Sequence, residues 1–117
     1  MTTTEQITNV ATALGWSVET DASRPGFTEF EFRQYTPAGQ DFGFSVEMRN
    51  GDPDSLLQEL EKYYEAYDPD YEAYLWIGTD GHGKNGAPYH IKDIVSDMEA
   101  AEAMIDTLYE TLKTALK

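Results

Sequence analysis

The sequence predicts a single α+β domain spanning residues 1–117, with helices packed on one face of an antiparallel sheet of three to four strands. Three observations lead to this fold class. A chain of 117 residues has the length of one domain. A hydrophobic fraction of 40%, which includes 8 Tyr, 5 Phe and 2 Trp, is sufficient for a packed core. Two runs of alternating apolar and polar residues lie between segments with helical spacing, which indicates a sheet combined with helices.

The N-terminal segment predicts a helix, a short strand and a loop. Thr3 or Thr4 caps the helix, and apolar residues then recur at helical spacing. These residues are Ile7, Val10, Ala11 and Leu14. Gly15 is expected to end the helix, because glycine readily takes the left-handed conformation that follows a helix. Alternation over residues 16–19 predicts the strand, and the polar residues 20–26 predict the loop.

Residues 27–49 carry the clearest local pattern, that of an antiparallel hairpin. Apolar residues alternate with polar ones on both sides of the Pro- and Gly-containing turn at residues 36–40. The apolar positions are Phe30, Phe32, Phe42, Phe44, Val46 and Met48. One aromatic face of this central hairpin is therefore expected to be buried.

A second helix follows, with Asp52 as its cap and Pro53 at its first position. Its apolar stripe consists of Leu56, Leu57, Leu60, Tyr63, Tyr64 and Tyr67. The sequence Asp-Pro-Asp at residues 68–70 interrupts the stripe. Residues 71–77 then fit two structures: their alternation favours a strand, whereas the Asp-Pro-Asp start suits a helix cap. We favour the strand, because the run is short and leads into a glycine-rich loop.

The C-terminal part predicts that loop over residues 78–88, a short helical turn at residues 91–97 and a long helix to about residue 116. The inner stripe of the long helix consists of Met98, Ala101, Ile105, Leu108 and Leu112. An outer acidic stripe consists of Glu99, Glu102, Asp106 and Glu110. Such a stripe is ordinarily a solvated face, although a row of this kind can also imitate the phosphates of DNA.

The net charge of −14, from 22 acidic and 8 basic residues, limits the partners of the chain. Direct nucleic-acid binding is not expected, because phosphate backbones are bound by Lys and Arg. Residues 51–77 hold eight acids and one lysine, so a charge of −7 lies there. Such a charge most commonly serves solubility, and the alternative is attraction to the basic surface of a partner protein. The absence of cysteine excludes disulfides and thiolate chemistry.

The start of the chain has no secretory-signal pattern, and no segment has the apolar length of a membrane span. We therefore expect a cytoplasmic protein that does not bind a membrane.

Motifs for nucleotides and metals are incomplete. Residues 78–84 have the spacing of a phosphate-binding loop, but Asn85 stands where a Ser or Thr would hold magnesium. Residues 68–79 begin like a calcium loop but lack its sixth-position Gly and its final Glu. Near the glycine-rich loop, metal-ligand types gather without the spacing of a known site. They are Asp80, His82, His90 and Asp93. No cofactor or metal is therefore expected.

Residues 63–76 combine aromatic and acidic side chains. The aromatic residues are Tyr63, Tyr64, Tyr67, Tyr71, Tyr74 and Trp76, and the acidic ones are Glu65, Asp68, Asp70 and Glu72. Tyr and Trp are favoured at protein interfaces, because they bury a large area and keep a polar tip. Helical spacing of the first three tyrosines favours core and core-edge positions, and the interface interpretation stays open beside it.

Residues 64–77 read Tyr-Glu-Ala-Tyr-Asp-Pro-Asp-Tyr-Glu-Ala-Tyr-Leu-Trp-Ile, and a glycine-rich loop and Met98-Glu99-Ala100-Ala101 follow. Over roughly residues 40–116, the chain resembles the small acidic uncharacterised proteins carried on conjugative and other mobile elements of gut bacteria. The resemblance implies a hairpin and an acidic C-terminal helix, and it brings no catalytic residues. The resemblance also implies that the gene lies on a mobile element. Such elements often carry acidic proteins that block restriction enzymes or tune conjugation.

The leading hypothesis is a non-enzymatic binding protein that presents an acidic, tyrosine-rich surface to a protein partner with a basic surface. The expected contact residues are Tyr63, Tyr67, Tyr71, Tyr74, Trp76, Glu65, Asp68, Asp70, Glu72, Glu99, Glu102, Asp106 and Glu110. Its sharper form is a DNA mimic of the anti-restriction type, the accessory of a mobile element. Two alternatives are a metal-dependent or hydrolytic enzyme that uses His82 and His90, and a structural homodimer formed through the tyrosines.

Overall fold

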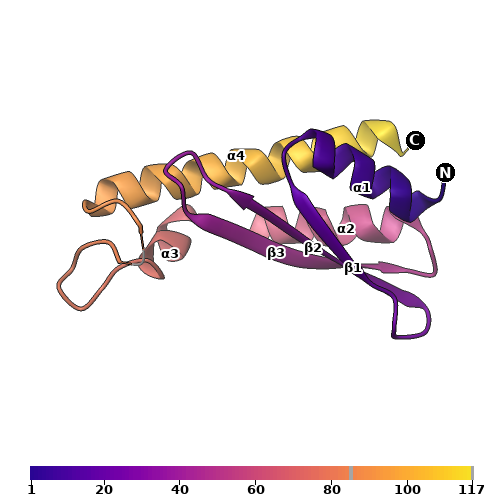
Figure 1. Cartoon of the computed structure of the whole chain (residues 1–117), viewed down its shortest axis with the longest axis horizontal. Coiled ribbons are helices and arrows are strands. Elements are labelled where there is room, and N and C mark those ends of the chain that lie inside the picture. The colour runs from indigo at the N-terminus through magenta and orange to yellow at the C-terminus, as the bar shows by residue number, and fades with distance from the viewer. Residues whose placement is uncertain (85, 117) are drawn as a thin grey trace.

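The computed structural model describes residues 1–84 and 86–116, so Asn85 and Lys117 lie outside the described residues. In chain order its elements are α1 Thr3–Ala13, β1 Ser17–Asp21, β2 Phe27–Tyr35, β3 Asp41–Arg49, α2 Pro53–Ala66, α3 Pro69–Tyr74 and α4 Ile91–Ala115. The strands form one antiparallel sheet in the order β1-β2-β3 (Figure 1). The predicted α+β class is confirmed, with three strands in the sheet.

The predicted hairpin of residues 27–49 is the centre of the sheet. β2 and β3 pair over nine residues each, from Phe27 opposite Arg49 to Tyr35 opposite Asp41. β1 pairs along the other side of β2. Side chains alternate between the faces of a strand, so the even-numbered residues of the hairpin share one face. Those that are buried are Phe30, Phe32, Phe42, Phe44, Val46 and Met48.

Helices α1, α2 and α4 pack on this buried face, and α4 runs along the length of the molecule (Figure 1). The predicted inner stripe of α4 is fully buried: Met98, Ala101, Ile105, Leu108 and Leu112. Ile7 of α1 and Leu60 of α2 enter the same core. The odd-numbered residues of all three strands are exposed or half-exposed, so the opposite face of the sheet remains open.

One predicted element is wrong: residues 69–74 form helix α3 and not the favoured strand. Asp68 caps this helix by accepting the N–H of Asp70 at 3.0 Å, and Pro69 takes the first helical position, where its missing N–H costs nothing. This local capping decides the structure, because the alternating residues after it are not buried together as a strand face would be. Only Ala73 of α3 is buried.

The element boundaries also differ from the prediction. α4 runs without a break from Ile91, because Ile94 and Met98 continue its buried stripe at a spacing of four residues. Thr2, and not Thr3 or Thr4, caps α1 through a capping box with Glu5. Within residues 1–84 and 86–116, no helix has the length and apolarity that a bilayer crossing requires.

A buried aspartate joins α4 to the β2–β3 turn. Asp97 is 5% exposed and accepts hydrogen bonds from the Thr36 hydroxyl, from the Ala38 N–H at 3.0 Å and from the Gln40 side-chain amide at 2.8 Å. A buried carboxylate needs such donors, because an unpaired one costs several kcal/mol. These hydrogen bonds hold the tip of the hairpin against α4.

Asp97→Ala removes the acceptor of all three donors, and we expect the free energy of unfolding to fall by about 3 kcal/mol. Glu99→Ala, two residues further along α4 and exposed, should change it by less than about 0.5 kcal/mol. Urea denaturation of both variants measures the difference. Equal stability of the two variants would contradict the role of Asp97.

Candidate functional site

Two of the predicted contact residues pack against the core: Tyr67 is buried in it, and Tyr63 is half-buried at its edge. The Tyr63 ring stacks on Phe44, with ring centroids 4.5 Å apart and planes 8° from parallel. Tyr67 is buried, and its hydroxyl donates to the Met98 carbonyl oxygen at 3.0 Å. Burial raises the pKa of Tyr63 to about 12 and raises that of Tyr67 as well. Both side chains therefore occupy the core or core-edge position that their helical spacing allowed, and not an interface position.

The predicted contact residues on and after α3 are divided between surface and core. Tyr71 is 63% exposed and Tyr74 is 71% exposed. Trp76 is half-buried against a small second core that includes Ile94 and Met98. Two exposed tyrosines therefore remain at this end of the molecule as surface aromatics.

The acids near α3 serve mainly its own structure. Asp68 is the cap, and Asp70 lies in the first turn, where a negative charge suits the helix dipole. Glu72 is half-buried, and burial in the first place, with Asp68 in addition, raises the pKa of Glu72. The cap and the helix dipole therefore explain Asp68 and Asp70 without a partner protein.

The outer acidic stripe of α4 faces α2 across a shared surface. The carboxylate of Asp106 lies close enough to Tyr64 of α2 to be the main cause that raises the Tyr64 pKa, with smaller effects of burial and of Glu102. Both acids are half-exposed. Acids that the sequence placed on separate helices are thus neighbours in space.

A second tyrosine, Tyr109 of α4, lies on the same surface. The Tyr109 hydroxyl of α4 donates to Oε2 of Glu61 on α2 at 2.9 Å, and this hydrogen bond is the main cause that raises the Tyr109 pKa. Glu110 and Glu65 raise it further through their charges. Tyr109 therefore ties the two helices together in the middle of a group of carboxylates.

We call this surface the acidic seam, and its members are Glu61, Tyr64, Glu65, Glu102, Asp106, Tyr109 and Glu110. Within the part of the chain that the structure describes, none of its five carboxylates forms an ion pair. A lysine on α4, Lys113, lies over the Tyr109 ring at 5.7 Å. Glu99, one helical turn before Glu102, extends the seam along α4. The seam is a strongly negative surface with two phenol rings in it.

Glu61, Tyr64 and Tyr109 are members of the seam that the sequence did not mark as site residues. Both helices carry the same short pattern, an acid followed three residues later by Tyr and then by Glu, at residues 61–65 and 106–110. In a helix these positions lie on one side, because residues three and four apart are neighbours. The repeated pattern was the available signal, but only the packing of α2 on α4 brings its two copies together.

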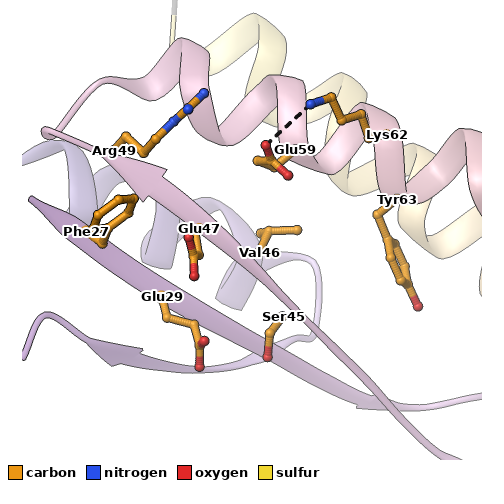
Figure 2. Close-up of a pocket in the computed structure, with 9 residues that line it drawn as sticks. All are labelled: Phe27, Glu29, Ser45, Val46, Glu47, Arg49, Glu59, Lys62 and Tyr63. Atoms are coloured by element: carbon orange, nitrogen blue, oxygen red, sulfur yellow. Dashed lines mark ion pairs between the residues drawn. The ribbon is translucent and has the colours of Figure 1, made fainter. Parts of the chain in front are cut away.

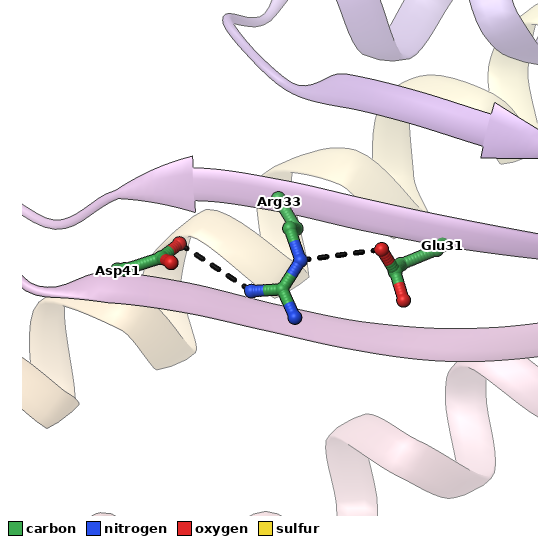
Figure 3. Close-up of polar contacts among 3 residues, drawn as sticks. All are labelled: Glu31, Arg33 and Asp41. Carbon is green, nitrogen blue, oxygen red and sulfur yellow. Dashed lines mark hydrogen bonds and ion pairs between the residues drawn. The ribbon is translucent and has the colours of Figure 1, made fainter.

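The open face of the sheet is also acidic, but cations partly neutralise it. Glu29 is directly opposite Asp21 on one side and Glu47 on the other, an arrangement of like charges that destabilises a sheet. Arg24 pairs with Glu47 at 2.7 Å. Arg33 bridges Glu31 and Asp41 at 3.2 and 3.4 Å (Figure 3). The seam is therefore the less compensated of the two acidic faces.

The loop between α3 and α4 closes on itself through backbone hydrogen bonds. The N–H of Lys84 donates to the Trp76 carbonyl at 2.9 Å, and that of Gly83 donates to the Tyr89 carbonyl at 3.1 Å. A Cβ at residue 83 would lie 1.9 Å from the Pro88 carbonyl oxygen, so only glycine fits there. These amides are used within the loop and do not form a cradle for phosphate.

The histidines of the enzymatic alternative lie on this loop and at the start of α4. His82 stacks on Tyr89, with ring centroids 4.0 Å apart, and its Nδ1 is 3.9 Å from Oδ2 of Asp80. His90 is the N-terminal cap residue of α4. Among the described residues, no three or more His, Asp or Glu side chains are grouped so that they could hold a metal ion, Asp93 included.

No protein-family model, no protein of curated function and no solved structure matches this chain. The resemblance to acidic proteins of mobile elements therefore stays a prediction.

The raised pKa of Tyr64 gives a direct test of the seam. Asp106→Asn and Glu102→Gln remove the charges that disfavour the tyrosinate, so each should lower the Tyr64 pKa toward its ordinary value, with the larger effect from Asp106→Asn. NMR titration of ¹³C-labelled tyrosine rings measures this pKa. Glu19→Gln, on the sheet, is the control and should leave it in place. An unchanged Tyr64 pKa in both seam variants would contradict the assembly of the seam.

The buried tyrosines predict a loss of stability at alkaline pH. Their pKa values are raised in the folded protein, so the stability they contribute is present below their ordinary pKa of about 10 and is lost as the pH rises through the folded values. The free energy of unfolding should fall as the pH rises above about 10, and less steeply in Tyr67→Phe. Tyr71→Phe, at an exposed position, should keep the wild-type slope. Urea denaturation at several pH values measures the slopes, and identical slopes for the two variants would contradict the prediction.

Proposed function

We propose that this chain is a non-enzymatic binding protein whose acidic seam holds a basic surface of a protein partner. The observation that carries the proposal is the convergence of five carboxylates from α2 and α4, none in an ion pair within the described residues, around Tyr64 and Tyr109. Like charges held together on a folded surface repel one another, and a cationic partner removes that repulsion.

The chemistry of the seam suits Lys and Arg side chains. Carboxylates accept charge-assisted hydrogen bonds from guanidinium and ammonium groups, and these are stronger than hydrogen bonds between neutral groups. The phenol rings of Tyr64 and Tyr109 add faces over which a cation can lie, as Lys113 lies over the Tyr109 ring. Tyr71 and Tyr74 of α3 are exposed and offer further aromatic side chains of the kind favoured at interfaces.

A DNA mimic is the most specific form of this proposal. Glu99, Glu102, Asp106 and Glu110 place negative charges at intervals of about 4.5–6 Å along the axis of α4. A regular row of negative charge is also what a DNA strand presents to the proteins that bind it. A nuclease or another DNA-binding protein is therefore the partner class with the matching basic surface.

Binding to a basic partner should depend on the seam and on salt. The double variant Glu102→Gln/Asp106→Asn removes two seam charges, and Glu19→Gln/Glu29→Gln removes two charges from the sheet face. In pull-downs from the source cell at low and moderate salt, wild type and the sheet variant should retain a protein that the seam variant loses. If no retained protein depends on the seam, the proposal is lost.

The DNA-mimic form has its own readout. The purified chain should relieve DNA cleavage by at least one enzyme in a panel of restriction endonucleases, and the seam variant should relieve it less than the sheet variant does. If the chain relieves cleavage by none of the enzymes in the panel, the DNA-mimic form is wrong. The broader proposal of a basic protein partner is then tested by the pull-down alone. Equal relief by both variants would place the active surface outside the seam.

A further inference from the structure

α3 and the loop that follows it lie at one end of the molecule, where the loop projects beyond the sheet (Figure 1). We call α3 together with residues 75–84 and 86–90 the α3 cap. The cap packs on the first turns of α4 through a small second core, in which the buried residues are Ala73, Ile94 and Met98. The buried residues of the main core come from the strands and from α1, α2 and α4. No described residue of the cap is buried in the main core.

Backbone hydrogen bonds hold the parts of the cap together. The N–H of Lys84 donates to the Trp76 carbonyl at 2.9 Å, and the N–H of Gly83 donates to the Tyr89 carbonyl at 3.1 Å. Ile77 and Gly83 also pair as an isolated antiparallel bridge. These contacts join the chain that leaves α3 to the chain that returns to α4. The cap is therefore one structural unit.

No polar contact fastens the cap to the rest of the molecule. Among the described residues, every hydrogen bond and ion pair made by residues 69–89 stays within residues 68–90. None of them reaches the sheet, α1, α2 or α4. The cap is therefore held closed by its apolar contacts with α4 and by its two connections to the chain.

α2 shows the difference that polar contacts make. A hollow of about 540 Å³ lies between α2 and β3 (Figure 2), but hydrogen bonds fasten α2 on two sides. The N–H of Arg49 at the end of β3 donates to Oγ of Ser55 at 2.8 Å, and the Tyr109 hydroxyl of α4 donates to Glu61 at 2.9 Å. The hollow of about 340 Å³ between the cap and the beginning of β3 is bridged by no such bond among the described residues.

Both connections of the cap pass through a residue in extended conformation. Asp68, between α2 and α3, has φ −123° and ψ 109°. His90, directly before α4, has φ −88° and ψ 136°, and its side chain makes no capping hydrogen bond. Tyr67 fixes the chain just before Asp68, because it is buried and its hydroxyl donates to the Met98 carbonyl at 3.0 Å. Residues at the ends of elements are the usual hinges, so Asp68 and His90 are the positions about which the cap can turn.

We propose that the α3 cap opens as one unit about Asp68 and His90 while the main core stays folded. Segments open locally where few buried apolar contacts hold them, and the second core is small. Opening uncovers Ile94 and the side of Met98 that faces the cap. Asp97 limits the opening, because its hydrogen bonds to the hairpin turn keep this part of α4 in place. The cap is thus a conformational device that hides or presents an apolar surface of α4, and it does not rest on the acidic seam.

Amide hydrogen exchange of the full chain, measured by NMR at urea concentrations below the main unfolding transition, tests the proposal. The amides of Gly78, Gly83 and Lys84 report on the cap, and those of Phe30 and Phe32 report on the sheet in the main core. We expect the three cap amides to share one opening free energy, lower than that of the core amides. Its dependence on urea should also be weaker, because opening the cap exposes less surface than global unfolding does.

Two buried helical alanines give matched variants. Ala73 of α3 lies in the second core and is 1% exposed, whereas Ala101 of α4 lies in the main core and is 0% exposed. Ala73→Gly destabilises the closed cap but not the open one, so it should speed exchange of the cap amides about fivefold or more. Ala101→Gly destabilises the closed and open forms alike. It should therefore speed exchange of the core amides by a similar factor and leave the cap amides unchanged.

Two results would overturn the proposal. If cap and core amides share one opening free energy, or if Ala101→Gly speeds both equally, the cap opens only when the whole molecule unfolds. If the cap amides exchange with unrelated opening free energies and do not respond to Ala73→Gly, the cap is not a unit. Circular dichroism checks that both variants fold, and the wild-type measurement decides between a shared and a separate opening without them.

Discussion

The packing of one face of a three-stranded sheet against α4 is the interaction on which the rest of the molecule depends. Phe30 and Phe32 are fully buried there against a helix whose inner stripe is also fully buried. Burying a side chain of this size contributes about 1.5–3 kcal/mol, so these contacts dominate the stability of a small domain. Asp97 completes the arrangement by holding the hairpin turn to the same helix.

This arrangement leaves particular surfaces uncovered. A sheet of three strands with helices on one side has an open face and two edges, and the longer edge belongs to β3. The helices in turn expose the sides that do not touch the sheet, where α2 and α4 bring their acids together. The acidic seam and the β3 edge are both consequences of how the core forms, and they lie on different sides of α2.

Much of the fold followed from patterns that act locally. The alternation of residues 27–49 predicted the hairpin, and the inner stripe of α4 was correct at every position because a helix has one buried side. Residues 71–77 were misassigned because a short alternating run fits two structures, and the cap at Asp68 decided between them. The Asp97 network was invisible, because its partners lie about sixty residues away in the chain.

The site was less accessible to sequence reasoning than the fold. Composition identified the acids but could not show which of them share a surface, since that depends on how α2 packs on α4. The helical spacing of Tyr63 and Tyr67 favoured the core, but only their contacts with Phe44 and Met98 decide between the core and an interface. β3 is an edge strand because of the order of the strands in the sheet. Hydrophobic alternation predicts a strand but does not say which strands lie at the edges.

Folding brings uncompensated negative charges of α2 and α4 together, and the salt dependence of the free energy of unfolding tests this most directly. Raising the ionic strength from about 0.01 to 1 M shortens the screening length from about 30 to 3 Å. The account predicts that the free energy of unfolding rises with salt, and that Glu102→Gln/Asp106→Asn reduces this rise more than Glu19→Gln/Glu29→Gln does. A stability that is independent of salt, or an equal response of the two variants, would contradict it.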